Sequence, residues 1–267
     1  MKYFTGIDIG SSTIKIAILN SNKELVTSYI CPTGSTFRKN TENAFEKTLH
    51  LHDLSSKDVT SIITTGYGRK LYPDAKENIS EISANALGVN YFSNGIHSIR
   101  TIINVGGQDS KIIHINEEGL VRNFVMNDKC AAGTGRFLEI VARILELDVD
   151  EMGDLHFAGK DNYPVINSTC AVFAESEIIS LLATGHSKAQ IAAGVHYSIA
   201  KRIIRLSSKI RIEHPVLFDG GAALNKGLHA ALEDELMKEV MILKDPQITT
   251  AVGAAVKAFD GCKFMEK

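Results

Sequence analysis

Two cysteines, Cys130 and Cys170, lie in matching stretches of the sequence. Cys130 belongs to "NDKCAAGTGRF", where small residues lead into the helix-like run "RFLEIVARILELD", and Cys170 repeats this arrangement in "NSTCAVFAESEIISLL". Neither cysteine is part of a C-x-x-C pair, so the spacing does not indicate a zinc ribbon or a thioredoxin-type site. Structural disulfides are rare in a reducing compartment, which leaves buried spectators or metal ligands as the interpretations of these residues.

Two other stretches have the composition of phosphate-binding hairpins. "GIDIGSSTIKIAIL" begins at Gly6 and "IINVGGQDSKIIHI" begins at Ile102, and each predicts an apolar strand, a glycine-centred turn and a second apolar strand. An alignment without gaps pairs Asp8 with Asn104, Gly10 with Gly106, and Lys15 with Lys111. A repeat with a period of about a hundred residues predicts two related domains rather than a solenoid.

The turns of these hairpins suit a polyphosphate ligand, because glycine lets main-chain N–H groups approach it and the hydroxyls and lysine add donors. The expected phosphate contacts are Gly10, Ser11, Ser12, Thr13, Lys15, Gly106 and Gly107. The expected catalytic residues are Asp8, Gln108 and Asp109. Asp8 and Asp109 would hold Mg²⁺ through water, and the alternative for Asp109 is that it only orders a water molecule alongside Gln108. One such hairpin alone would be read as an ordinary tight turn; the aligned pair favours nucleotide binding.

A third glycine cluster, "PVLFDGGAALNKGL", follows a predicted strand over residues 216–218. A Gly-Gly step lets a flat base or ribose lie against the backbone. The expected nucleoside contacts are therefore Gly220, Gly221, Ala222, Asn225 and Lys226. By contrast, "TTGYGRKL" (residues 64–71) is expected to be a structural or surface loop and not a phosphate site.

The bulk composition of the 267 residues limits the function further. Apolar residues make up 44% of the chain, enough for a substantial core, and the net charge of -2 gives no sign of a nucleic-acid or acidic-membrane partner. No apolar run reaches the roughly 18 residues of a membrane helix, and the first residues lack the pattern of a signal peptide. We therefore expect a cytoplasmic protein.

The domain boundaries follow from the second hairpin and the last helix. The hairpin repeat starts again near residue 100, and "PQITTAVGAAVKAF" predicts a helix of small residues, including Gly253, that packs closely on another element. We expect a first domain of residues 1–98 plus 246–267 and a second domain of residues 99–245, which carries the two cysteines.

Together these motifs resemble the actin, sugar-kinase and heat-shock-chaperone ATPase superfamily. "DIGSSTIK" looks like its first phosphate loop, "NVGGQDSK" like its second and "FDGGAALNKG" like its adenosine loop. A closer resemblance, to the ATP-dependent activators of 2-hydroxyacyl-CoA dehydratases and the related ATPase subunits of benzoyl-CoA reductase, rests on "VTSIITTGYGR", "INVGGQDSK", "MNDKCAAGTGRFLE", "STCAVFAESE" and "GGAALNKG". It covers nearly the whole chain and implies an α/β fold of two related actin-like (ribonuclease H-like) ATPase domains with a nucleotide cleft between them.

The resemblance also implies the cofactors and partners. ATP or ADP with Mg²⁺ would bind the hairpins, and a homodimer would hold one 4Fe-4S cluster between its subunits through Cys130 and Cys170 of each chain. The count agrees with this, because an all-cysteine cluster needs four thiolates. ATP would drive single-electron transfer to an iron–sulfur dehydratase or reductase, with ferredoxin or flavodoxin as the electron source.

Other interpretations stay open from the sequence alone. A single-chain cluster could also use Cys31, which precedes Pro32 in a predicted loop, and Cys262, which lies near the C-terminus. Two other functions compete with electron donation, namely a sugar or small-acid kinase of the same superfamily and a nucleotide or redox sensor without turnover. The scattered histidines lack ligand spacing and receive no predicted role.

Overall fold

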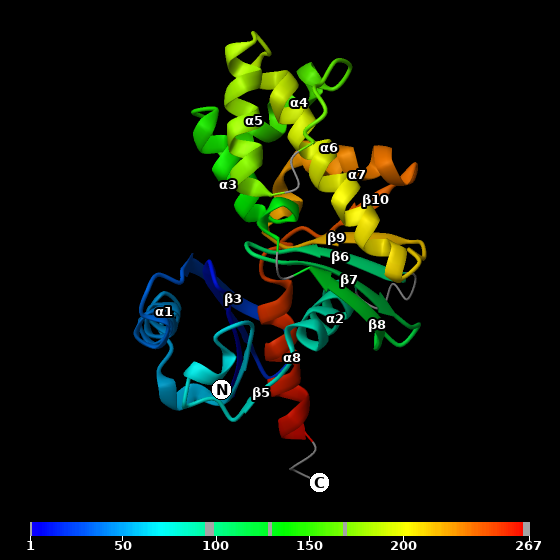
Figure 1. Ribbon diagram of the computed structural model, residues 1–267. Helices are drawn as coiled ribbons and strands as arrows, with labels where there is room; N and C mark the ends of the chain where they lie inside the picture. The colour runs from blue at the N-terminus through cyan, green and yellow to red at the C-terminus, as the bar shows by residue number, and fades with distance from the viewer. Residues whose placement is uncertain (1, 94–98, 128–129, 168–169, 264–267) are drawn as a thin grey trace. The chain divides into compact units, whose positions relative to one another are not determined.

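The computed structural model describes residues 2–93, 99–127, 130–167 and 170–263 (Figure 1). Asp128, Lys129, Ser168 and Thr169 of the cysteine motifs lie outside the described residues. The structure contains two mixed five-stranded sheets with helices, which confirms the expected α/β class. Within the described residues, no helix has both the length and the apolar composition needed to cross a membrane.

The chain divides into two compact units. Unit 1 comprises Met1–Ser98, Ile115–Arg122 and Gln247–Lys267, and unit 2 comprises Ile99–His114 and Asn123–Pro246. The units differ from the expected domains mainly in residues 115–122, which group with unit 1. The division into domains at residues 98 and 246 stays a prediction.

The sheet of unit 1 has the strand order β3-β2-β1-β4-β5. Its central strand β1 is antiparallel to β2 and parallel to β4. The elements are β1 (Tyr3–Ile9), β2 (Thr13–Leu19), β3 (Leu25–Pro32), α1 (Phe37–His50), η1 (Ser56–Asp58), β4 (Val59–Thr65), η2 (Arg69–Leu71), β5 (Glu77–Asn78), α2 (Glu81–Phe92) and α8 (Thr249–Lys263), where η denotes a 3-10 turn.

Apolar residues cover both faces of this sheet, as alternation along a strand requires. Phe4 and Leu19 belong to a buried cluster with α8, and the ring of Phe4 meets the edge of Phe259 at 5.0 Å. Ile7 and Ile16 belong to a second cluster with α1 on the other face. The sheet is therefore a middle layer whose central strands are fixed from both sides.

The C-terminal helix α8 lies against β1 and against α2 at backbone distance (Figure 1). A Cβ atom at Gly253 would lie 1.7 Å from the carbonyl oxygen of Ala84 on α2. One at Gly6 of β1 would lie 2.0 Å from the carbonyl oxygen of Ala251 on α8. The expected close packing of the small-residue helix is confirmed, because only glycine leaves room for these contacts.

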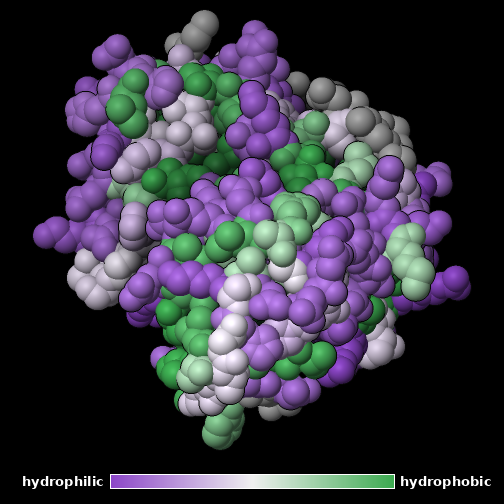
Figure 2. Space-filling model, turned by 90° about the horizontal axis from the view of Figure 1, so that it is seen from above, coloured by the Kyte–Doolittle hydropathy of each residue, from purple (hydrophilic) through white to green (hydrophobic). Residues whose placement is uncertain are grey.

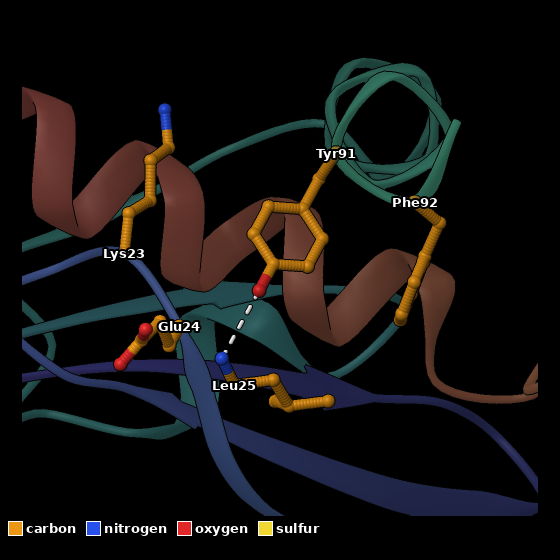
Figure 3. Close-up of a pocket in the computed structure, with 5 residues that line it drawn as sticks. All are labelled: Lys23, Glu24, Leu25, Tyr91 and Phe92. Atoms are coloured by element: carbon orange, nitrogen blue, oxygen red, sulfur yellow. Dashed lines mark hydrogen bonds between the residues drawn. The ribbon is translucent and has the colours of Figure 1, made fainter. Parts of the chain in front are cut away.

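The side chain of Tyr91 joins α2 to β3. The Tyr91 hydroxyl accepts a hydrogen bond of 3.0 Å from the Leu25 N–H, as Figure 3 shows. The surface pocket drawn there is lined by Lys23, Glu24, Leu25, Tyr91 and Phe92. The ammonium group of Lys23 pairs with Asp260 of α8 at 3.0 Å, so the polar groups of this pocket hold neighbouring elements of unit 1 together.

The second sheet has the order β10-β9-β6-β7-β8, with β6 antiparallel to β7 and parallel to β9. This is the topology of the first sheet, so the repeat predicted from the hairpins extends over all five strands. The elements are β6 (Thr101–Val105), β7 (Ser110–Ile115), β8 (Val121–Asn127), η3 (Ala131–Gly133), α3 (Gly135–Ile144), α4 (Val149–Gly159), α5 (Ala171–Ala183), α6 (Lys188–Leu206), η4 (Ser207–Lys209), β9 (Val216–Asp219), η5 (Gly221–Leu224), α7 (Lys226–Leu236) and β10 (Val240–Ile242).

The helices of unit 2 share one large core with this sheet. Val105 and Phe218 of the strands belong to the same buried cluster as Phe137 of α3 and Ile178 of α5. Helix α6 is the longest helix of the described chain and packs against both α4 and α7. It begins with a capping box in which the Ser187 and Gln190 side chains bond to each other's backbone N–H groups.

Two histidines meet in the core between α4 and α6. The Nδ1 atoms of His156 and His196 lie 3.3 Å apart, and both side chains are fully buried. Burial, and then the adjacent His156, lower the pKa of His196 to about 3. Burial also lowers the pKa of His156, although Asp234 opposes the effect. Both rings are therefore neutral in the folded protein at pH 7, a pairing that their separation of 40 residues did not predict.

We expect His196→Gln to flatten the acid side of the stability curve. Unfolded histidine has a pKa near 6.5, so below that pH the unfolded chain binds a proton that folded His196 refuses. In the parent protein, His196 should therefore lower the free energy of unfolding by up to about 1.4 kcal/mol for each unit that the pH falls from 6 to 4. The His196→Gln variant should lack this contribution. Urea unfolding at several pH values measures the slope. The exposed His52→Gln is the control, and parallel curves for parent and His196→Gln would contradict the assignment.

Candidate functional site

The first glycine hairpin joins β1 to β2 in unit 1. Asp8 and Lys15 face each other in the strand register, and the Lys15 ammonium lies 3.1 Å from Oδ2 of Asp8. The Gly10 N–H donates to the carbonyl of Thr13 at 3.1 Å and closes the turn. A Cβ at Gly10 would lie 2.8 Å from that carbonyl oxygen, so the turn requires glycine. The structure thus brings the predicted carboxylate, cation and glycine turn together.

Thr33, which follows β3, fastens this turn from the side. Its N–H donates to the Ser12 carbonyl at 3.0 Å, and its hydroxyl donates to the Gly10 carbonyl at 2.7 Å. Ser11, Ser12 and Thr13 are half-buried. Thr33 therefore fixes the backbone of the turn, while the side chains of the predicted phosphate contacts remain partly accessible.

The second hairpin, between β6 and β7, repeats the turn with a different polar arrangement. The Gly106 N–H donates to the Asp109 carbonyl at 2.9 Å. The carboxylate of Asp109 lies 2.6 Å from the ammonium of Lys111, whose side chain is only 5% exposed. Gln108 is exposed at the turn, and Gly107 is half-buried. The ion pair of this hairpin therefore joins Asp109 and Lys111, which are two residues apart in the chain, whereas the ion pair of the first hairpin joins residues on two facing strands.

Asn104 takes the place that Asp8 has in the first sheet. It faces Lys111 on β7 and Asp219 on β9, and its amide donates to Oδ2 of Asp219 at 2.9 Å. Asp219 is fully buried. Unit 2 therefore has a buried amide–carboxylate pair at the strand ends and an accessible carboxylate, Asp109, in the turn.

The third glycine cluster follows β9 as predicted. Gly220 has a φ of +92°, and a Cβ there would lie 2.5 Å from the Val105 carbonyl oxygen. Its N–H donates to the Pro246 carbonyl at 3.1 Å. Gly221 is exposed and Ala222 is buried, so the Gly-Gly step presents backbone at the surface next to the end of β6.

Asn225 and Lys226, at the end of this cluster, are engaged within the chain. The Asn225 oxygen accepts from the Leu228 N–H at 2.8 Å and caps α7, while its amide nitrogen donates to the Val149 carbonyl at 2.9 Å. Lys226 pairs with Asp154 at 2.8 Å on the surface. The hydrogen bond that Lys226 donates to Asp154 raises the pKa of Lys226. Nucleotide contact by these two residues stays a prediction.

Helix α3 begins directly on the second hairpin, a contact that the sequence did not predict. The N–H groups of Gly135 and Arg136 donate to the carbonyls of Gly106 and Gly107, both at 2.9 Å. A Cβ at Gly135 would lie 3.1 Å from the Gly106 oxygen, so a larger residue would loosen the contact. The sequence feature that could have indicated this contact is the pair of glycines in "GTGRFL". These glycines match no dinucleotide fingerprint, and Gly135 instead allows the backbone of α3 to approach the backbone of the hairpin.

Both cysteines precede helical turns of unit 2. Cys170 is exposed and occupies the N-cap position of α5. Cys130 is half-buried and is the N-cap residue of the short turn η3, and Thr134, after that turn, is the N-cap residue of α3. The expected place at a helix start therefore holds directly for Cys170, whereas one 3-10 turn separates Cys130 from its α-helix.

Apolar side chains reach the surface beside Cys170. Val172, Phe173 and Ile179 of α5 are 70%, 69% and 53% exposed, although the buried face of the same helix packs against α3. Figure 2 shows one face of the molecule, on which hydrophobic residues reach the surface in patches among hydrophilic ones. Large exposed apolar side chains that gather on one helix are typical of an interaction surface.

Comparison with known proteins decides the family. Residues 5–258 match the model of the BadF/BadG/BcrA/BcrD ATPase family. The chain belongs to this ATPase family. Its expected fold class, with two sheets in actin-like units, is confirmed as well, because the chain superposes over nearly its whole length on a solved structure with 42% sequence identity.

Relatives in the family align along their full lengths. The chain is 42% identical to the 2-hydroxyisocaproyl-CoA dehydratase activator of Clostridioides difficile, over 99% of this chain and 98% of that protein. It is 42% identical to the activator of lactoyl-CoA dehydratase of Anaerotignum propionicum, over 98% and 99%. The solved structure of the first activator, with bound ADPNP, superposes with a TM-score of 0.92 over 99% of this chain and 97% of that one.

We expect Lys15→Ala to weaken ATP binding or hydrolysis by at least about tenfold, because a charge-assisted hydrogen bond contributes about 1.5–3 kcal/mol. Titration with a fluorescent ATP analogue and phosphate release measure the two effects. Lys23→Ala is a matched control, since Lys23 also forms an ion pair in unit 1 but with Asp260. Equal affinity and turnover in Lys15→Ala and the parent would contradict the role.

A second prediction concerns the structural part of the site. We expect Asn225→Ala to lower the free energy of unfolding by about 1–3 kcal/mol without any nucleotide present, because it removes an N-cap and a bond to α4. Lys226→Ala, next in the chain but exposed, should leave the stability nearly unchanged. Urea unfolding of both variants makes the comparison. An Asn225→Ala variant as stable as the parent would show that the cap contributes little.

Proposed function

We propose that this protein is an ATP-dependent activator of a 2-hydroxyacyl-CoA dehydratase, to which it donates single low-potential electrons. The observation that carries the proposal is the alignment with two dehydratase activators at 42% identity over nearly the whole length of each protein. An alignment of that extent leaves no room for the substrate insertions that a sugar or small-acid kinase needs.

We infer that the hairpins of both units bind ATP. Lys15 and the turn at Gly10 act on the phosphates from unit 1, and the turn at Gly106 and Gly107 acts from unit 2. Asp8 and Asp109 supply the carboxylate oxygens that Mg²⁺ prefers, and the bound ion would neutralise charge on the phosphates. The solved structure of the related Clostridioides difficile activator holds ADPNP, an ATP analogue, and this supports the assignment.

The cysteines of unit 2 fit one half of an iron–sulfur ligand set. Unit 2 contains two cysteines, Cys130 and Cys170, and the structure records neither in a disulfide. Two chains related by a twofold axis would provide the four thiolates of a 4Fe-4S cluster, which when bound supplies a one-electron carrier. Cys170 is the N-cap residue of α5, and the free backbone N–H groups at a helix N-terminus favour an anionic group such as the cluster.

A homodimer around this axis would cover the exposed side chains of α5. Val172 and Phe173 lie in the first turn of α5, shortly after Cys170, and Ile179 lies about two turns further along the helix. In a twofold interface each such residue meets the equivalent surface of the partner. Burying these apolar side chains would stabilise the dimer and keep water from part of the thiolate site.

A continuous set of contacts supports coupling between nucleotide and cysteines. The turn at Gly106 and Gly107 accepts two hydrogen bonds from the start of α3, and Cys130 lies one 3-10 turn before that helix. Helix α3 in turn packs against α5, which begins at Cys170. Movement of the hairpin on ATP binding would therefore reach both thiolates, provided that ATP binds the two states with different affinities.

We expect Cys130→Ser and Cys170→Ser to abolish the cluster while ATP hydrolysis persists, because the hairpins carry the nucleotide chemistry. Iron and sulfide analysis of anaerobically purified protein, with the mass of the oligomer, should give about four irons per dimer in the parent. Activation of a 2-hydroxyacyl-CoA dehydratase, in the presence of ATP and a reductant, should be lost in the same two variants.

Cys31→Ser and Cys262→Ser are the matched controls, since both residues are half-buried cysteines of unit 1. They should keep the iron content and the activation. A full cluster in each monomer, or loss of iron in Cys31→Ser, would contradict the bridging arrangement. ATP-dependent phosphorylation of a sugar or small acid by iron-free parent protein would favour the kinase interpretation instead.

A further inference from the structure

The loop that follows β4 approaches the carboxylate of Asp8. Strand β4 ends at Thr65, Gly66 has a φ of +86°, and Tyr67 and Gly68 lead into η2. Asp8 and Thr65 are partners in the parallel register of β1 and β4, so the loop begins at the strand end where Asp8 lies. The sequence predicted a structural loop here, without a ligand-related role.

Gly66 lies against one carboxylate oxygen. A Cβ at this position would lie 2.4 Å from Oδ1 of Asp8 and 2.8 Å from the Ile9 carbonyl oxygen. The other oxygen of Asp8, Oδ2, is the one that pairs with Lys15 at 3.1 Å. Because the carboxylate is bounded on both sides, any side chain at position 66 would push Asp8 away from its present orientation.

Hydrogen bonds fix the loop in this place. The Gly68 N–H donates to the Ile9 carbonyl at 2.8 Å and ties the loop to the end of β1. The Gly66 carbonyl accepts from the Arg69 guanidinium at 3.0 Å, and the Thr64 hydroxyl donates to the Arg69 carbonyl at 2.8 Å. The loop is therefore a preorganised wall beside Asp8.

A glycine with a positive φ follows the corresponding strand of the second sheet, so this feature belongs to the structural repeat. Gly220 follows β9 as Gly66 follows β4, has a similar φ of +92°, and approaches the Val105 carbonyl as Gly66 approaches that of Ile9. The difference lies in the partner residue. In the first sheet the glycine also borders an acidic side chain, Asp8, whereas Asn104 occupies the equivalent place in the second.

We propose that Gly66 is a positioning residue that holds the Asp8 carboxylate in the orientation needed to engage the Mg²⁺ of bound nucleotide. The inference rests on the proposed function, which places Mg²⁺–nucleotide at the β1–β2 hairpin. The structure gives Asp8 one polar partner within the described residues, Lys15, so Oδ1 keeps its capacity for a metal ion or a metal-bound water.

The experiment compares nucleotide affinity with Mg²⁺ and with EDTA, using a fluorescent ATP analogue. In the parent, Mg²⁺ should tighten binding. Gly66→Ala should lose at least about tenfold of this Mg²⁺ enhancement, as Asp8→Asn does, while the affinity in EDTA stays close to that of the parent. A merely structural role would instead change both affinities together or neither.

Backbone strain is controlled separately, because alanine is disfavoured at a positive φ. Gly185→Ala is the matched control, since Gly185 has a φ of +93° and a Cβ there would meet nothing within 4 Å. It should lower the melting temperature and keep the Mg²⁺ enhancement. Gly66→Asn provides a second test should Gly66→Ala fail to fold, because asparagine tolerates left-handed conformations while still adding a Cβ.

Each outcome decides the matter. A folded Gly66→Ala or Gly66→Asn variant with the parent's Mg²⁺ enhancement overturns the positioning role and leaves the proposed function standing. An Asp8→Asn variant with full enhancement overturns it as well, because Gly66 would then have nothing to position. A parent that binds no ATP analogue overturns the proposed function and this inference together.

Discussion

The central strand of each sheet is hydrogen-bonded on both sides in a fixed register, antiparallel to one neighbour and parallel to the other. This pairing brings a hairpin turn and the end of a second strand to one edge of the sheet. A slip of one residue would turn every side chain of the strand to the opposite face. The polar groups at that edge, Asp8 with Lys15 and Asn104 with Asp219, therefore depend on the apolar residues that fix the register.

Glycine is the second constraint, because the elements meet at backbone distance where glycine permits it. Helix α8 reaches β1 and α2 through Gly6 and Gly253, and α3 reaches the second hairpin through Gly135. In the core of unit 2, Gly227 lies so close to the paired histidines that a Cβ would be 2.6 Å from Nδ1 of His196. At Gly6, Gly253 and Gly135 one backbone lies directly against another, whereas at Gly227 the backbone lies against the histidine side chains.

The two halves share a topology and differ in chemistry. Unit 1 keeps a carboxylate at the end of its central strand, whereas unit 2 has Asn104 there, bonded to a buried aspartate, and carries its accessible carboxylate in the turn. Unit 2 also holds the helices that follow the cysteines. This asymmetry fits the proposed division of labour, in which one hairpin of the pair is joined directly to α3 and thus to the redox half of the molecule.

Much of this could be predicted from local patterns. The glycine turns, the paired strands, the nucleotide-binding class and the two cysteine segments all follow from residues close together in the chain, since strand periodicity and turn chemistry are local properties. Tertiary structure alone decided the contacts between distant segments. Four contacts join residues whose proximity has no local signature. They are the hydrogen bonds between α3 and the turn at Gly106, the bond from Asn225 to Val149, the buried pair of His156 and His196, and the approach of Gly66 to Asp8. They exist because packing of whole elements brings the residues together, and that packing is set by the register and the core rather than by any one motif.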